Sequence, residues 1–121
     1  MAQHNDLGKK GEELAEAYLV QNNYQIIQRN AIYDRNEIDI IASNSEYIIF
    51  VEVKTRSSAY WGNPEEAVSA TKIKRIVAAA DFYLNEKNIN KPARFDVIAV
   101  VINKGSIDIE HIEDAFFAPL N

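Results

Sequence analysis

The stretch "FVEVKTR", residues 50–56, is the most informative part of this chain about its fold. It continues the most apolar segment of the chain, yet two charges interrupt it. Ile48 and Ile49 precede it, so it has the composition of the end of a buried strand. Glu52 and Lys54 nevertheless lie two residues apart within it. Buried strands rarely carry charges unless the charges are paired or take part in chemistry. The stretch therefore indicates both a strand in the core and a candidate site.

The periodicity on either side predicts two helices and five strands. Apolar residues recur at helical spacing over residues 7–21 and 71–87. Strand-forming segments cover residues 24–33, 37–42, 46–54, 94–102 and 106–112. The run 94–102 barely alternates, as in a strand buried on both faces, whereas 106–112 alternates like an edge strand. This order predicts one α/β domain over residues 1–121, with a mixed five-stranded sheet flanked by helices.

Composition limits the classes of function. Of 121 residues, 47% are hydrophobic and 26% charged, which is typical of a soluble globular domain. No apolar run reaches the ~20 residues of a membrane helix, and the N-terminus lacks the apolar core of a signal peptide, so we expect a cytoplasmic protein without a membrane partner. Cysteine is absent, and His4 and His111 share no ligand spacing. Any metal ion would therefore be held mainly by oxygen, which suits Mg²⁺ or Mn²⁺.

Alternation along the two central strands predicts one apolar face and one face that becomes charged. Side chains of a strand point to opposite faces in turn, so Ile38 and Ile40 are expected on the same, apolar face. The other face is apolar near the turn between the strands and charged at its far end, where it carries Glu37, Asp39, Glu52 and Lys54.

The pairing of these strands depends on where the chain turns. A turn at residues 44–45 pairs Ala42 with Tyr47 and puts Asp39 diagonal to Glu52, ~7–8 Å away. A shift of two residues puts Asp39 directly opposite Glu52. In both registers one ion can bridge the two carboxylates.

Carboxylates crowded at one end of a sheet repel each other unless a proton or a cation intervenes. Asp39 and Glu52 supply hard oxygen ligands for a divalent ion, the backbone carbonyl of Val53 can add another, and waters complete the shell. Lys54, one pleat along, can orient or deprotonate a water or offset charge on a phosphate. These residue types in this pattern favour metal-assisted phosphodiester hydrolysis.

Asp39 followed by "EVK" resembles the D…(D/E)xK signature of the restriction-endonuclease-like nucleases. The whole chain is similar to the YraN family, small bacterial proteins predicted to be nucleases and related to archaeal-type Holliday junction resolvases. The similarity depends on the stretches "GKKGEELAEAYL", "RN" at residues 29–30, "EIDIIA", "FVEVKTR", "WGNPEEAV", "KIKRIVAAADFYL" and "RFDVIAV". Two positions depart from the family pattern, namely Ile38, where a proline is common, and Asn36, where a glycine is usual.

This resemblance implies a restriction-endonuclease-like fold and a nuclease-type site, but it does not imply a particular substrate. Our first interpretation is a nuclease that acts on branched or otherwise structured DNA. The resemblance also implies that Glu12, on the first helix, completes the catalytic set of Asp39, Glu52 and Lys54, and that the protein forms a homodimer. For Glu12 the alternative is an ordinary surface glutamate. For the other three it is a partly buried salt bridge between Lys54 and one acid.

Two further classes of function stay open. One is a catalytically silent DNA- or protein-binding module of the same fold, and the other is a small-molecule or interaction protein whose acids are structural. The net charge of -5 argues against DNA, but the basic residues are unevenly placed. We expect a phosphate-binding rim, with a solvated surface as the alternative, at Arg29, Arg56, Lys72, Lys74 and Arg75. Tyr60 and Trp61 can stack on unpaired bases or cover the core.

Overall fold

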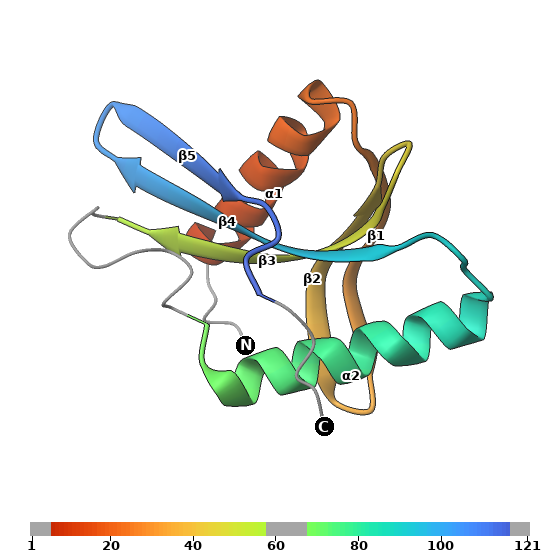
Figure 1. Ribbon diagram of the computed structural model, residues 1–121. Helices are drawn as coiled ribbons and strands as arrows, with labels where there is room; N and C mark the ends of the chain where they lie inside the picture. Colours follow the sequence, from red (N-terminus) through yellow and green to blue (C-terminus); the bar gives the residue numbers. More distant parts are fainter. Residues whose placement is uncertain (1–5, 58–67, 117–121) are drawn as a thin grey trace.

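The computed structural model describes residues 6–57 and 68–116, which form one α/β domain with a five-stranded sheet between two helices (Figure 1). Apart from shifts of one or two residues at several ends, these elements are the predicted ones. The predictions for Tyr60, Trp61 and His4 lie outside the described residues. The elements are α1 (Asp6–Gln21), β1 (Gln25–Tyr33), β2 (Asn36–Ser43), β3 (Ile48–Arg56), α2 (Ala70–Lys87), β4 (Ala93–Asn103) and β5 (Ser106–Ile112).

The strands lie in the sheet in chain order, β1-β2-β3-β4-β5. All neighbouring strands are antiparallel except β3 and β4, which are parallel. The crossover connection that contains α2 returns the chain to the end of the sheet where β3 begins. The prediction of a mixed sheet is therefore confirmed. β4 is buried along most of its length, and β5 lies at an edge, as their apolar patterns predict.

Each face of the sheet is covered by one helix (Figure 1). Ala15 and Leu19 of α1 pack on Val51 and Ile98. On the opposite face, Ile76, Ala79, Ala80 and Tyr83 of α2 pack among Phe50, Phe95 and Val97. Two apolar faces explain why the middle strands read as continuous apolar runs. Neither helix in the described part of the chain is long and apolar enough to cross a membrane.

The turn between β2 and β3 corrects the first of the two expected registers. Ala42 pairs with Ile49 rather than with Tyr47, so the turn is centred on residues 45–46, one residue later than assumed. The cause is Asn44, whose Oδ1 accepts hydrogen bonds from the backbone N–H groups of Glu46 (2.9 Å) and Tyr47 (2.8 Å). This side chain fixes the turn and selects the register that is shifted by two residues.

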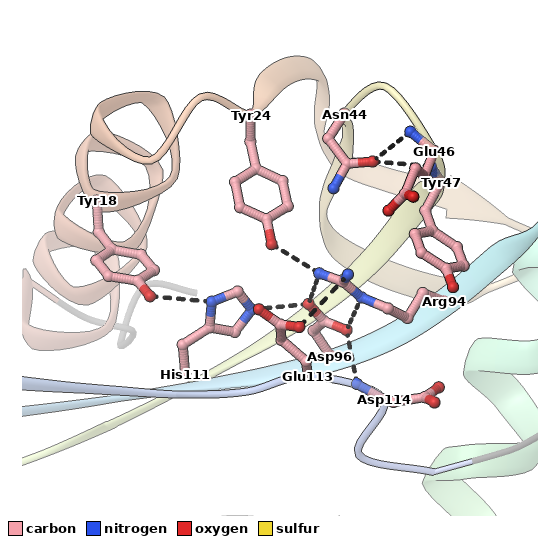
Figure 2. A network of polar contacts seen from close by, with 10 residues as sticks. All are labelled: Tyr18, Tyr24, Asn44, Glu46, Tyr47, Arg94, Asp96, His111, Glu113 and Asp114. Atoms are coloured by element: carbon pink, nitrogen blue, oxygen red, sulfur yellow. Dashed lines mark hydrogen bonds and ion pairs between the residues drawn. The ribbon is translucent and has the colours of Figure 1, made fainter.

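A buried polar cluster connects the C-terminal part of α1, at Tyr18, to β4 and β5 (Figure 2). Asp96 is 0% exposed, and Arg94 donates to both of its carboxylate oxygens at 2.9 Å and 2.8 Å. His111 Nε2 lies 2.7 Å from Asp96 Oδ2, and Tyr18 Oη lies 3.0 Å from His111 Nδ1. Because a carboxylate only accepts, Nε2 carries the proton, and in the neutral ring Nδ1 accepts from the Tyr18 hydroxyl.

The same cluster includes a residue of the sheet edge. His111 lies on the edge strand β5, but its side chain is largely buried. Arg94 also donates to Tyr24 Oη at 2.7 Å, and the Asp114 N–H donates to Asp96 at 3.0 Å. Because these groups are satisfied internally, the cluster fixes the position of α1 over the sheet.

Candidate active site

Asp39 and Glu52 are the first residues beyond the end of the ladder between β2 and β3. The last pair of that ladder is Ile40 with Val51, so the same register extended by one position would bring Asp39 level with Glu52. Beyond that point a side chain replaces the backbone as the hydrogen-bond acceptor, because Asp39 Oδ2 accepts a hydrogen bond from the Val53 N–H at 2.8 Å. In an extended strand the N–H and C=O of one residue point to the same edge, so the Val53 carbonyl also points toward β2.

The strand bends locally at Asp39, which corrects the expected alternation. Ile38 packs in the cluster under α2, whereas Ile40 packs in the cluster under α1. The neighbouring strand is irregular beside it, since Asn30 of β1 has φ of 50°. A left-handed residue in a ladder increases the local twist. Asp39 therefore lies between paired residues of the β1–β2 ladder but just beyond the end of the β2–β3 ladder.

Glu52 is a buried carboxylate whose hydrogen bonds are incomplete. The residue is 4% exposed, and its Oε1 has no hydrogen-bond partner within residues 6–57 and 68–116. Its Oε2 lies 3.3 Å from Lys72 Nζ and 3.9 Å from Lys54 Nζ. A buried charge needs compensation on both oxygens, so a cation-binding role fits Glu52 better than a purely structural one.

The two lysines reach Glu52 from different elements. Lys54 lies on the same strand, two residues on, and its side chain is 24% exposed. Lys72 comes from the first turn of α2, where its backbone N–H donates to the N-cap Ser69 Oγ at 3.1 Å. The sequence predicted Lys54 beside Glu52 but placed Lys72 on a phosphate-binding rim. The structure brings Lys72 into the site itself.

Gly11 allows Glu12 to approach these residues. A Cβ atom at Gly11 would lie 1.9 Å from Thr55 Oγ1, so α1 packs directly against β3 there. Burial, and then the charges of Glu37 and Glu52, raise the pKa of Glu12 above its ordinary value. Glu12 therefore lies within electrostatic reach of Glu37 and Glu52. Its catalytic role stays a prediction.

Asn30 is a site residue that sequence reasoning missed. With its amide oriented to satisfy both groups, Nδ2 donates to Glu12 Oε1 (3.3 Å) and Glu37 Oε2 (3.1 Å). It thus holds the helix carboxylate and the β2 carboxylate together. The sequence contains one signal for this role, because an asparagine within a strand pattern is unusual and tolerates left-handed backbone.

The pKa of Asp39 is affected by the negative charges close to it. Burial, followed by the Glu52 charge, raises the pKa of Asp39 well above its ordinary value. The Val53 N–H and the Lys72 ammonium act in the opposite direction, but they do not cancel the effect. A divalent cation would relieve the same repulsion without protonating the carboxylate.

The residues fit a magnesium-type ion only with help from backbone and water. In the part of the chain that the structure describes, no three histidine, aspartate or glutamate side chains converge to hold an ion. Mg²⁺ commonly binds through one or two carboxylates and keeps several waters. Asp39, Glu52 and the Val53 carbonyl meet this requirement, and Glu52 Oε1, which has no hydrogen-bond partner in the described part of the chain, can serve as a ligand atom.

A pocket of about 290 Å³ opens beside Asp39, between α1 and the strands β1 and β2. Both acidic and basic side chains line it, so a ligand there meets charges of both signs. Through it Asp39 and Glu12 are accessible from the α1 side. The lining residues are Lys9, Glu12, Glu13, Glu16, Arg29, Asn30, Asp39 and Ile40.

The predicted basic rim is distributed over several elements. Arg29 forms a bidentate pair with Glu16 of α1, with Nε to Oε1 at 2.7 Å, so a phosphate would have to compete with that pair. Arg56 donates to the Thr55 carbonyl at 3.0 Å. Lys74 and Arg75 are exposed on α2, next to Lys72. Phosphate binding by these residues stays a prediction.

Similar proteins cover nearly the whole length of this chain. The family described as "Uncharacterised protein family UPF0102" matches residues 11–100. UPF0102 proteins of Phocaeicola vulgatus and Bacteroides thetaiotaomicron are 47% and 48% identical over 120 residues, and each match covers 99% of both chains. The UPF0102 protein of Christiangramia forsetii is 47% identical over 117 residues, which is 97% of this chain and 98% of that protein.

Proposed function

The chain belongs to the uncharacterised protein family UPF0102, the YraN-like family that its sequence resembles, and we propose that it is a metal-dependent nuclease acting on DNA. The observation that carries the proposal is Glu52, a buried carboxylate whose Oε1 has no hydrogen-bond partner among the described residues. It lies with Asp39 just beyond the end of the β2–β3 ladder and beside the ammonium group of Lys54. A structural salt bridge needs neither the second carboxylate nor the free oxygen.

Each residue has a role in this proposal. Asp39, Glu52 and the Val53 carbonyl would hold Mg²⁺ or Mn²⁺, and Glu12 adds negative charge from the α1 side. An ion held there would supply Lewis-acid chemistry, which polarises a phosphate and lowers the pKa of a water molecule. Lys54 orients that water or offsets charge on the phosphate oxygens. Lys74 and Arg75 contact the DNA backbone without reading sequence.

Branched or structured DNA is the proposed substrate class, and a homodimer in the cytoplasm is proposed with it. Resolvase-type nucleases act as dimers on two-fold junctions, which motivates both statements. Light scattering of the purified protein at micromolar concentration tests the dimer. A monomer at all concentrations would remove the reason to prefer a two-fold substrate.

Lys54→Met tests the catalytic role, because methionine keeps much of the apolar stem and removes the charge. Cleavage of branched, flapped and single-stranded DNA in Mg²⁺ or Mn²⁺ should fall by ~10²–10⁴-fold. The urea midpoint of unfolding, measured on the same preparation, should hold or rise. Lys87→Met, at the far end of α2, is the matched control for loss of one lysine.

Two outcomes would reject this assignment. If Lys54→Met loses ~3–5 kcal/mol of stability yet cuts at the wild-type rate, Lys54 is the partner of a buried carboxylate and not a catalytic group. If the wild type cuts none of these DNA forms with either ion, the protein is not a nuclease of this class.

The second candidate is a catalytically silent DNA- or protein-binding module. One observation favours it, namely the ion pair between Lys72 Nζ and Glu52 Oε2 at 3.3 Å, which compensates the Glu52 charge in part without any metal. Salt-dependent DNA binding without cleavage would support this candidate.

A further inference from the structure

The ammonium group of Lys72 lies beside Glu52, at the carboxylate that would bind the metal ion. Its Nζ lies 3.3 Å from Glu52 Oε2, closer than the 3.9 Å of Lys54, and Glu52 is almost fully buried. Its positive charge also lowers the pKa of Asp39, against the effects of burial and of Glu52. Lys72 therefore acts electrostatically on both carboxylates of the proposed metal site.

The position of Lys72 in its helix is unfavourable for a simple structural lysine. It lies in the first turn of α2, where the helix dipole disfavours a positive charge. Ser69 caps this turn by accepting from the Lys72 N–H, so the backbone of Lys72 is held by a contact that does not involve its side chain. The side chain is 40% exposed, so solvent is open to the ammonium group if it leaves Glu52.

We propose that Lys72 is a built-in substitute for the divalent ion: it neutralises Glu52 in the metal-free protein and is displaced when the ion binds. This inference rests on the proposed metal site at Asp39 and Glu52. The ion and the ammonium group compete for the same carboxylate, so each lowers the affinity of the other. The displaced Lys72 stays beside the site, where a phosphate of the substrate can take the place of Glu52 as its partner.

Mn²⁺ titration by calorimetry gives the first measurement, on wild type, Lys72→Gln, Asp39→Ala and Lys87→Gln. Lys87, in the last turn of the same helix, is the matched control for loss of a lysine charge. Lys72→Gln should bind Mn²⁺ about tenfold more tightly than wild type, because the ion no longer displaces a cation. Lys87→Gln should match wild type, and Asp39→Ala should lose the binding.

Chemical acetylation of wild-type protein, mapped by mass spectrometry, gives the second measurement and detects displacement directly. An ammonium group held by Glu52 is protected from the reagent, and a displaced one is exposed to it. Mn²⁺ should therefore raise the labelling of Lys72 and leave that of Lys87 unchanged. Neither measurement uses nuclease activity, so both keep their meaning if the protein cuts no DNA.

The outcomes separate this inference from the proposed metal site. If Asp39→Ala loses Mn²⁺ binding but wild type and Lys72→Gln bind equally, the metal site stands and the substitution by Lys72 is wrong. Tighter binding with unchanged Lys72 labelling also overturns it, since Lys72 would then repel the ion without leaving Glu52. Binding to Lys72→Gln but not to wild type supports it. Binding to neither protein overturns both proposals.

Discussion

Gly11→Ala should push α1 away from β3 and draw Glu12 out of the candidate site. The new Cβ would lie 1.9 Å from Thr55 Oγ1, 2.7 Å from Cγ2 and 2.8 Å from Cβ. Rotation of the Thr55 side chain moves Oγ1 and Cγ2, but it leaves its Cβ in place. The helix must therefore retreat by roughly 0.6–1.5 Å to reach the 3.4 Å at which ordinary contact begins.

Two opposing terms set the expected loss of stability. Forcing an extra methyl group into a packed contact costs about 1–3 kcal/mol. Alanine is better than glycine inside a helix by about 1 kcal/mol. The free energy of unfolding should therefore fall by at most about 2 kcal/mol, so the protein stays folded. A displacement of Glu12 by ~1 Å should lower cleavage of DNA by about 10²-fold, because catalytic geometry tolerates little error.

A double-mutant cycle with Thr55→Ala measures this contact. Thr55→Ala removes the two nearest atoms and leaves only the Cβ at 2.8 Å. In urea denaturation, Gly11→Ala should cost at least ~1 kcal/mol less in the Thr55→Ala protein than in wild type. The reasoning is refuted if Gly11→Ala gains the full ~1 kcal/mol of helix propensity and the cycle is additive. Glycine would then be replaceable, and α1 would not owe its position to this contact.

Three further perturbations test separate parts of the molecule. Burial and the Glu52 charge raise the pKa of Asp39, so the charged form of Asp39 destabilises the fold above that pKa. Asp39→Asn in metal-free buffer should therefore raise the melting temperature at neutral pH. This gain should vanish as pH falls below the ordinary aspartate pKa. Burial alone would raise the pKa of Asp96, but hydrogen bonds from His111 and Arg94 hold that pKa below its ordinary value. The lowered pKa stabilises the fold at pH values above the ordinary pKa, and this stabilisation is lost as pH falls through the lowered pKa. Asp96→Ala should cost ~3–5 kcal/mol in urea denaturation by leaving Arg94 without its carboxylate, and a loss under 1 kcal/mol would show that the cluster is not structural. Lys74→Ala and Arg75→Ala should each reduce the salt slope of DNA binding by about 1, whereas an unchanged slope would make them solvated surface residues.

The helices and strands and their order were predictable from local patterns of residues. The apolar stripe of α2 reappears as the buried residues Ile76, Ala80 and Tyr83, and the unbroken apolar run of β4 reappears as a strand covered on both faces. Such patterns are readable because burial follows the local period of the backbone, 3.6 residues in a helix and two in a strand. Glu52 and Lys54 were visible for the same reason, since charge in an apolar strand breaks the pattern.

Which of these residues come into contact depends on the packing of the whole domain. The turn lies one residue later than expected, and that single residue moves the pairing of β2 and β3 by two, so that Asp39 and Glu52 both follow directly after the last pair, Ile40 with Val51. Asn44 causes the difference through its side-chain hydrogen bonds, which a count of apolar residues does not register.

Lys72 and Asn30 are the clearest contributions of the tertiary structure to the site. Lys72 is 20 positions from Glu52 in the chain, and it reaches Glu52 only because the capped first turn of α2 lies next to the end of β3. Asn30 joins Glu12 and Glu37 only because α1 packs closely on the sheet at Gly11. Local periodicity encodes which face a side chain takes, whereas contacts between distant elements depend on register, caps and helix approach, and these are fixed when the whole domain packs.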